Sequence, residues 1–323
     1  MPTSTPEISV VVPLFDEEEN LGELHRRLTR ALEPLTASYE LVFVNDGSRD
    51  ATGAMLDELR RDDPRLVVLH LSRNFGHQAA LCAGIDHARG EAVILMDGDL
   101  QDPPEVLDRF IAAWREGHDV VYAVRAQRQE HWTKRCAYAL FYRIWRAVSD
   151  LDIPLDSGDF CLMDRKVVEV LKHLPERQRF VRGLRSFVGF KQIGIRYARP
   201  ARAAGTPKYT WSALFRLALD GLVGFSSFPL TLVTYLGLAC GVLAVLLTIG
   251  LTVSAWSQDA LPAGWLCAVL VMLYLGATQL LSLGIVGEYV RRIFLEVKGR
   301  PTYLVDRAAR GPVIAETVSI SSR

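Results

Sequence analysis

"EAVILMDGDLQDPPE", residues Glu91–Glu105, begins as an apolar run typical of a buried strand and ends in closely spaced carboxylates. Asp97, Asp99 and Gln101 stand at alternate positions directly after the run. Two like charges this close destabilise each other unless a hard cation neutralises them. Mg²⁺ and Mn²⁺ take few protein oxygens and complete their shells with water and phosphate oxygens. The segment therefore predicts a strand whose end holds Mg²⁺ or Mn²⁺ and, through the ion, a diphosphate.

The chain up to residue 165 alternates between short β-branched runs and segments of helical periodicity. Strands are expected at residues 8–13, 40–45, 65–71, 91–96 and 119–124, and helices at Asn20–Leu32, Ala51–Arg61 and His77–Ala88. This alternation predicts an α/β fold with a mostly parallel, Rossmann-like sheet and helices on both faces. In such sheets, ligands bind beyond the carboxyl ends of the strands.

Polar residues follow four of the expected strands at that edge. They are Asp16–Glu19, Asn45–Ser48, Ser72–His77 and the pair Asp97 and Asp99. Helix capping accounts for Ser48, Asp50 and Asp102, because Ser and Asp favour helix N-termini. Capping explains too little for Asp97 and Asp99, so a ligand site is predicted where the four strand ends meet.

Composition argues against several classes of function. The chain of 323 residues has 37 basic and 37 acidic residues, a balance that gives no support to nucleic-acid binding. Its five cysteines form no C-x-x-C pair, which argues against zinc and for a reducing compartment. The sequence has neither a P-loop motif nor a G-x-G-x-x-G after the first strand, so both common phosphate cradles are lacking. A nucleotide held by carboxylates and a metal ion is the remaining expectation.

Two long uncharged runs follow the α/β region, Gly221–Gln258 and Ala260–Gly287. About 20 apolar residues are enough to cross a bilayer, so transmembrane helices are expected near Pro229–Trp256 and Gly264–Val290. Their outer flanks carry Lys and Arg and the loop between them carries none, which places the N-terminal region and both termini in the cytoplasm. The first residues contain no basic leader typical of a signal peptide.

The expected organisation is a cytoplasmic α/β domain at residues 1–207, an interfacial amphipathic helix at 208–227, two membrane helices at 228–290 and a cytoplasmic tail at 291–323. The tail after Asp306 shows no strong periodicity and is expected to be loose. His131–Asp150 mixes aromatic and basic residues, as a helix in the lipid headgroup region would. Packing of that helix on the sheet is the alternative.

Five motifs together resemble one family. They are VVPLFDEEENL (residues 11–21), VNDGSRD (44–50), LSRNFGHQ (71–78), MDGDLQDPPE (96–105) and DSGDFCLMDR (156–165). In this order, with an apolar hairpin behind them, they resemble the polyprenyl-phosphate glycosyltransferases, membrane-attached members of the inverting family-two transferases. The resemblance runs from about Ile8 to about Tyr303 and is closest to the bactoprenol glucosyltransferase and dolichyl-phosphate mannose synthase-like branch. It implies a GT-A fold.

The resemblance also implies roles for individual residues. Asp99 and Asp97 match the D-x-D metal pair, and Gln101 matches a further metal ligand. The catalytic candidates are Asp159 beside the acceptor, Asp97, and Asp156 as the weaker one. Nucleotide binding is implied for Pro13, Phe15, Glu17, Asp46, Arg73 and Asp97, with Asp46 accepting from the base, and phosphate or acceptor binding for Arg179, Arg182 and Lys208. The family commonly has Asn where this chain has Asp16.

The implied reaction transfers a sugar, with inversion, from a nucleotide diphosphate sugar to a polyprenyl phosphate such as undecaprenyl phosphate. UDP-glucose is the first choice of donor, and the product would be a lipid-linked monosaccharide for glycan or lipid modification. A GDP-mannose-dependent mannose synthase, a UDP-aminoarabinose transferase and a membrane-tethered nucleotide-binding scaffold without turnover remain as alternatives. The resemblance further implies a multi-pass protein of the inner membrane that assembles as a homotetramer.

Overall fold

The computed structural model of the chain describes residues 5–125, 157–176, 179–198, 228–257, 264–310 and 313–317. Its residues divide into two compact units. The first consists of Met1–Tyr142, Leu151–Lys208 and Pro301–Arg323, and the second of Arg143–Asp150 and Tyr209–Arg300. The expected interfacial helix at 208–227 and the segment His131–Asp150 lie outside the described residues.

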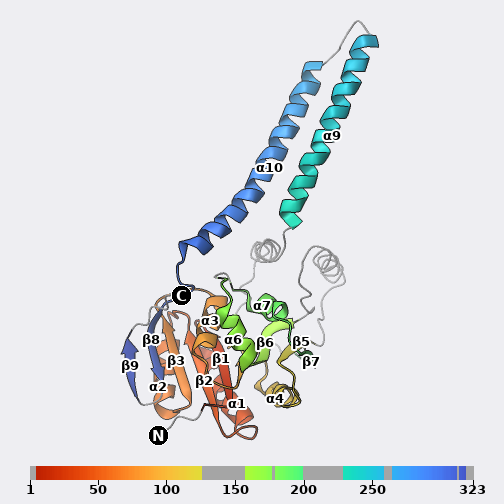
Figure 1. Cartoon of the computed structure of the whole chain (residues 1–323). Coiled ribbons are helices and arrows are strands. Elements are labelled where there is room, and N and C mark those ends of the chain that lie inside the picture. The colour runs from red at the N-terminus through yellow and green to blue at the C-terminus, as the bar shows by residue number, and fades with distance from the viewer. Residues whose placement is uncertain are drawn as a thin grey trace. The chain divides into compact units, whose positions relative to one another are not determined.

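The described residues of the first unit form a nine-stranded sheet with the order β7-β5-β6-β4-β1-β2-β3-β8-β9 (Figure 1). The strands are β1 Ile8–Leu14, β2 Tyr39–Asn45, β3 Leu66–Leu71, β4 Ala92–Leu95, β5 Val120–Arg125, β6 Ser157–Asp164, β7 Gln192–Tyr197, β8 Val305–Arg310 and β9 Val313–Thr317. The neighbours β4, β1, β2 and β3 are parallel, as are β5 and β7. β6 runs antiparallel between β4 and β5, and β8 and β9 are antiparallel additions beyond β3. Four of the five strands that the sequence predicted form this parallel block, and the fifth, β5, lies on the other side of β6.

Six α-helices of this unit are described: α1 Glu18–Leu32, α2 Thr52–Asp62, α3 His77–His87, α4 Leu107–Arg115, α6 Arg165–His173 and α7 Val181–Phe187. A short 3₁₀ turn, Pro104–Val106, precedes α4. All five expected strands and all three expected helices are confirmed, with bounds that differ by no more than a few residues.

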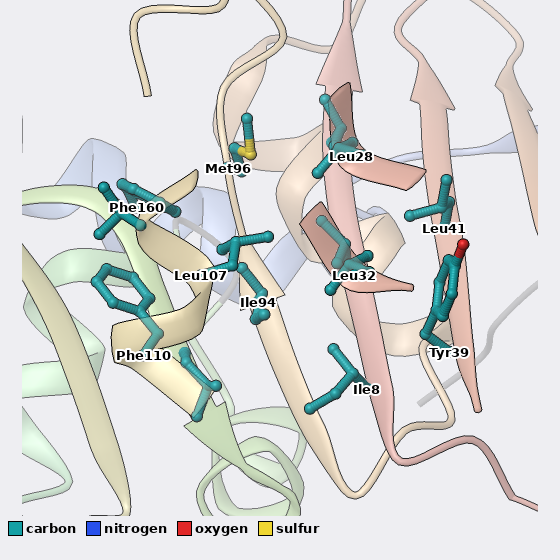
Figure 2. Close-up of a cluster of buried hydrophobic side chains, with 14 of the residues drawn as sticks. Ile8, Leu28, Leu32, Tyr39, Leu41, Ile94, Met96, Leu107, Phe110 and Phe160 are labelled. Atoms are coloured by element: carbon teal, nitrogen blue, oxygen red, sulfur yellow. The ribbon is translucent and has the colours of Figure 1, made fainter. Parts of the chain in front are cut away.

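Every residue of β1 is buried, because helices cover both faces of the sheet. On one face, Leu28 and Leu32 of α1 pack in the same buried cluster as Ile8 of β1 (Figure 2). On the other face, Gly84 of α3 lies so close to Val11 that a Cβ atom would collide with the Val11 side chain. A strand buried on both faces reads as a continuous apolar run, which is how β1 appears in the sequence.

The described part of the chain's end, β8 and β9, is not loose. β8 pairs with β3, placing Ala308 opposite Leu69, and β9 pairs with β8. Arg307 of β8 also donates to Asp57 of α2 at 2.9 Å. The prediction of a loose tail is therefore wrong for β8 and β9. The segment has little intrinsic strand pattern, and its conformation comes from pairing with the buried edge of β3.

The second unit contains two long helices, α9 Phe228–Ser257 and α10 Gly264–Lys298, which lie side by side (Figure 1). Both helices were expected, and α10 continues beyond the predicted end of its span into residues assigned to the tail. Within the part of the chain that the structure describes, no helix has the length and hydropathy of a membrane span.

Candidate functional site

β1 ends in a tight turn that is fastened to the loop after β2. Asp16 has a φ of +52°, in the left-handed region, and its backbone N–H donates to Ser48 Oγ at 3.1 Å. The Asp16 carboxylate accepts from the Arg49 N–H at 2.7 Å, and the Glu17 N–H donates to Thr52 Oγ1 at 3.0 Å. The hydroxyl of Ser48 thus accepts a hydrogen bond from the turn after β1. The Asp16 side chain helps to hold that turn against the loop after β2.

Three predicted nucleotide-binding residues lie at this turn. Pro13 is buried within β1, whereas Phe15 and Glu17 follow it half-buried. The Glu17 carboxylate accepts from Asn20 Nδ2 at 2.7 Å. The structure therefore brings these three residues to the carboxyl edge of the sheet, and their contact with a nucleotide stays a prediction.

Asp46 lies at the end of β2, is 2% exposed, and holds the loop after β3. Its two carboxylate oxygens accept from the N–H groups of Phe75 at 2.7 Å and Gly76 at 2.9 Å. Burial raises the pKa of Asp46, although these two bonds oppose the rise. Carboxylate oxygens have further lone pairs that a nucleobase could use. Asp46 thus has a structural role besides the predicted one of accepting from the base.

Gly47 brings the same two loops into backbone contact. It has a φ of +66°, and a Cβ atom at this position would lie 2.5 Å from the carbonyl carbon of Arg73. The predicted nucleotide-binding side chain of Arg73 is exposed and stacks over the Phe75 ring, 4.0 Å from its centroid. Arg73 and Asp46 are therefore neighbours in space, as the prediction of a shared nucleotide site requires.

Asp97 and Asp99 follow β4 in a turn in which Gly98, between them, packs against the Leu14 side chain. A Cβ atom on Gly98 would lie 2.6 Å from Leu14 Cδ2. Asp99 Oδ1 accepts from the Gln101 N–H at 3.1 Å, so the backbone fixes the orientation of this carboxylate. Asp99 is buried, at 9% exposure, whereas the Asp97 side chain is 32% exposed.

The carboxylates around Asp97 suit a divalent cation. Burial raises the pKa of Asp97 to about 6, and the charges of Asp102, Asp159 and Asp99 add to the rise, while His77 opposes it. A cation at this position would relieve that repulsion. Within the described residues, no three His, Cys, Asp or Glu side chains are arranged to hold a metal ion by themselves. The residues therefore fit an ion that two carboxylates hold and that takes other oxygens from a ligand and water.

The antiparallel direction of β6 brings Asp159 to the same edge. Leu95 of β4 lies opposite Cys161 of β6, so Asp97, just beyond β4, and Asp159, near the start of β6, approach each other. The Nε2 atom of His77 lies 3.5 Å from Asp97 Oδ1 and 3.5 Å from Asp159 Oδ2. His77 thus stands between the predicted metal side and the predicted acceptor side of the site.

Charged neighbours keep Asp159 ionised. Burial by itself would raise the pKa of Asp159, but the His77 imidazole and the guanidinium groups of Arg182 and Arg185 lower it to about 2. Partial desolvation would lower the pKa of His77, and the carboxylates of Asp159 and Asp97 overcome this effect and raise it. Arg182 Nε lies 3.7 Å from Asp159 Oδ1. The predicted acceptor-side pair, Asp159 and Arg182, is therefore brought together.

Arg179 is used at the end of a helix. Its guanidinium donates to the backbone carbonyls of Lys172, in the last turn of α6, and of Leu174 and Glu176, just after it, each at 3.2 Å. It also lies 3.8 Å from Asp86 Oδ1. These bonds satisfy carbonyls that the helix leaves unpaired. The structure thus gives Arg179 a capping role, and its phosphate-binding role stays a prediction.

Two predicted site residues, Asp156 and Lys208, lie outside the described residues. Two others were missed. Gln78 donates to Asp159 Oδ2 at 2.9 Å, and Arg185, fully buried, donates to the Gly158 carbonyl at 3.3 Å. Gln78 closes the LSRNFGHQ motif, so its place in the first turn after a strand end was a usable signal. Nothing in the sequence distinguished Arg185 from a surface arginine.

Comparisons with known proteins show the family of the chain. The family model described as "Glycosyl transferase family 2" matches residues 9–172. An uncharacterized glycosyltransferase of Synechocystis sp. is 43% identical over 302 residues, 93% of this chain and 95% of that protein. The uncharacterized glycosyltransferase YkcC of Bacillus subtilis is 42% identical over 93% of each chain. The bactoprenol glucosyl transferase of Shigella phage SfII is 40% identical over 94% of this chain and 99% of its own.

Proposed function

Because the chain belongs to glycosyl transferase family 2, we propose that it transfers a hexose from a nucleotide diphosphate sugar to a polyprenyl phosphate. The sheet and its covering helices form the GT-A-like α/β fold of these hexosyltransferases. Relatives named bactoprenol glucosyl transferase, similar over almost their whole length, support the lipid acceptor. The same names favour glucose as the sugar, and UDP-glucose is the donor we propose.

The observation that supports the proposal most is that Asp97, Asp99 and Asp159 lie at one edge of the sheet. His77 lies between Asp97 and Asp159. Asp97 and Asp99 would hold Mg²⁺ or Mn²⁺, which as a Lewis acid stabilises the charge that develops on a diphosphate leaving group. Asp46, Arg73 and the turn after β1 lie on the strand ends where the nucleotide would bind. The site therefore has a donor side and an acceptor side.

Asp159 would orient the acceptor. A phosphate monoester has a second pKa of about 6, so near neutral pH it is already largely an anionic nucleophile and needs no base. The pKa of Asp159, lowered to about 2, makes this carboxylate a weak base at that pH. Arg182, 3.7 Å away, offers the positive charge that an incoming phosphate requires. Displacement in a single step from the face opposite the leaving group inverts the anomeric carbon.

We further propose that α9 and α10 attach the protein to the inner membrane, with both termini on the cytoplasmic side. α9 carries no charged residue, and both helices expose large apolar side chains, among them Leu238 (66%), Met272 (72%) and Leu280 (71%). Exposed apolar surface of this kind needs an apolar partner. Attachment to the membrane would bring the site close to the proposed acceptor, which is itself a membrane lipid. The protein is expected in the membrane pellet after alkaline extraction, and release into the supernatant would contradict the attachment.

A transfer assay in detergent tests the reaction. Purified protein is incubated with undecaprenyl phosphate and radiolabelled UDP-glucose, GDP-mannose or UDP-aminoarabinose, with Mg²⁺, with Mn²⁺ or with EDTA. Metal-dependent labelling of the lipid by UDP-glucose is expected. Labelling by another donor would show that the transferred sugar is a different one from glucose. Saturable nucleotide binding without labelled lipid would contradict the proposal that a polyprenyl phosphate is the acceptor. Light scattering of the same sample tests the homotetramer that the resemblance implies.

A further inference from the structure

One side chain, Gln78, joins three elements of the candidate site. Gln78 lies in the first turn of α3, and its Nε2 atom donates to Asp159 Oδ2 at 2.9 Å. Its Oε1 atom accepts from the N–H of Val181, the first residue of α7, at 3.0 Å. These two bonds fix which end of the Gln78 amide is oxygen, because a backbone N–H can only donate. The amide of Gln78 is therefore held between β6 and α7.

The bond from Gln78 leaves the two oxygens of Asp159 in different environments. Oδ2 accepts from Gln78, and Nε2 of His77 lies 3.5 Å from it. Oδ1 is buried without a hydrogen bond among the described residues, and so is Nε of Arg182, 3.7 Å away. A buried acceptor and a buried donor left this close and unbonded are costly unless a ligand completes them. One carboxylate oxygen is thus anchored, and the other is left beside Arg182 without a hydrogen bond among the described residues.

We propose that Gln78 is a positioning residue of the transfer reaction, which holds Asp159 so that Oδ1 and Arg182 face the acceptor phosphate. The inference deepens the proposed function and rests on it. Gln78 acts through Asp159 and need not touch the substrate. Positioning of this kind is valuable in a displacement reaction, because a shift of about 1 Å in a reacting partner can cost about 100-fold in rate.

The same segment reaches the donor side. Asp46 accepts from the N–H groups of Phe75 and Gly76, and His77 and Gln78, the next two residues, contact Asp159. Four consecutive residues therefore connect the carboxylate at the end of β2 with the carboxylate on β6. A positive φ of 97° at Gly76 lets the chain turn between these two sets of bonds.

Two substitutions separate the two bonds of Gln78. Gln78→Glu keeps an oxygen for the Val181 N–H and, when ionised, replaces the donor to Asp159 with a second negative charge, whereas Gln78→Leu removes both bonds without adding a charge. The matched control is Gln192→Leu, because Gln192 Nε2 donates to the carbonyl of Arg185 at 3.0 Å and so also ties down α7. Wild type and the three variants are compared in lipid transfer, in donor hydrolysis without lipid, and in UDP-glucose affinity by titration.

Both Gln78 variants are expected to lose about 10- to 100-fold in kcat for lipid transfer, the rate equivalent of one hydrogen bond to a charged group. UDP-glucose affinity and donor hydrolysis should change less than about twofold, so the ratio of transfer to hydrolysis falls. A Gln78→Glu enzyme that transfers like wild type would overturn the inference, as would equal losses in all three variants. Absence of transfer by the wild type would instead overturn the proposed function, and the inference with it.

Discussion

Asp97, just beyond the end of β4, and Asp159 of β6 share His77: their nearest carboxylate oxygens are both 3.5 Å from its Nε2 atom. The imidazole separates two like charges and lowers the pKa of both carboxyl groups. Asp97 nevertheless has a raised pKa, because burial and three other carboxylates act against His77. Asp159 has a lowered pKa, because the guanidinium groups of Arg182 and Arg185 act in the same direction as His77. A cation beside Asp97 would therefore relieve repulsion between carboxylates, whereas Asp159 is already neutralised by neighbouring guanidinium groups.

This difference predicts different metal responses from two matched variants. Asp99→Asn should raise the Mn²⁺ concentration for half-maximal transfer by at least about tenfold, since even residues that only orient metal ligands cost 10- to 100-fold in affinity. Asp159→Asn should lower kcat and leave the metal requirement within about twofold of wild type. The check is a titration of transfer activity with Mn²⁺ after treatment with EDTA. A shifted metal requirement in Asp159→Asn as well would contradict the division of the edge into two sides.

The placement of the carboxylates that follow β2 and β4 could be predicted because it depends on local sequence. β1, β2, β3 and β4 are buried on both faces, so each appears as an apolar run that ends abruptly in polar residues. Parallel strands then carry those polar residues to one edge without further information. Asp46, Asp97 and Asp99 all followed from this rule.

The position of Asp159 could not be predicted in the same way, because it depends on strand direction. β6 places Asp159 beside Asp97 only because it runs antiparallel to β4, and nothing in Ser157–Asp164 specifies that direction. The resemblance supplied Asp159 where the pattern could not. Likewise, a sequence cannot distinguish the helix-capping bonds of Arg179 from the site-facing position of Arg182, since both are arginines in one basic stretch.

Gly47 provides a test of the contact between the loops after β2 and β3. Gly47→Ala combines a left-handed φ with a Cβ atom 2.5–2.9 Å from the backbone of Arg73 and Asn74. We expect a loss of about 2–5 kcal/mol in the free energy of unfolding, the sum of conformational strain and overpacking. UDP-glucose affinity should fall as well, because the displaced loops carry Asp46 and Arg73.

The control for that variant is Gly117→Ala. Gly117 also has a positive φ, +89°, but no heavy atom lies within 4 Å of a Cβ built on it. Strain alone should cost about 1–2 kcal/mol. Thermal unfolding and nucleotide titration of both variants give the comparison. Equal losses in the two proteins would show that backbone strain, and no contact between the loops, explains the effect.

A buried histidine predicts how stability depends on pH. Asn45 Oδ1 accepts from the Ser48 N–H at 2.9 Å, so Asn45 Nδ2 must donate to His70 Nδ1, 3.0 Å away. His70 Nδ1 is therefore an acceptor and the ring is neutral, with Nε2 donating to Asp57 at 3.3 Å. Burial lowers the pKa of His70, and Arg307 lowers it further, against the carboxylates of Asp57 and Asp306.

Because the folded pKa of His70 is lowered, its contribution to stability is complete above the ordinary value of 6.5 and is lost as pH falls below it. In that range the unfolded chain binds a proton that the folded chain does not. The free energy of unfolding should fall by up to about 1.4 kcal/mol per pH unit from this group. His70→Gln should remove that part of the slope between about pH 5 and 7, as followed by denaturant unfolding. Parallel slopes for the two proteins would contradict the neutral ring.

The pairing of β8 with β3 predicts that the end of the chain stabilises the first unit. Without β8, β3 would become an edge strand, although all six of its residues are buried, and its backbone groups would face water or another chain. A variant ending at Arg300 also loses the bond from Tyr303 Oη to Asp86 Oδ2 at 2.8 Å. It should unfold at a lower temperature than wild type and aggregate on heating.

Two further variants separate the strand from the single bond. A chain ending at Thr317 keeps β8 and β9 and should unfold like wild type. Tyr303→Phe keeps both strands and loses one hydrogen bond, which should cost about 1.5–3 kcal/mol because the acceptor is charged. If the chain ending at Arg300 were no less stable than Tyr303→Phe, the pairing of β8 with β3 would contribute nothing to the stability of the first unit. A clearly larger loss means instead that residues after the second unit complete the fold of the first, so the two units cannot be separated by cutting the chain at α10.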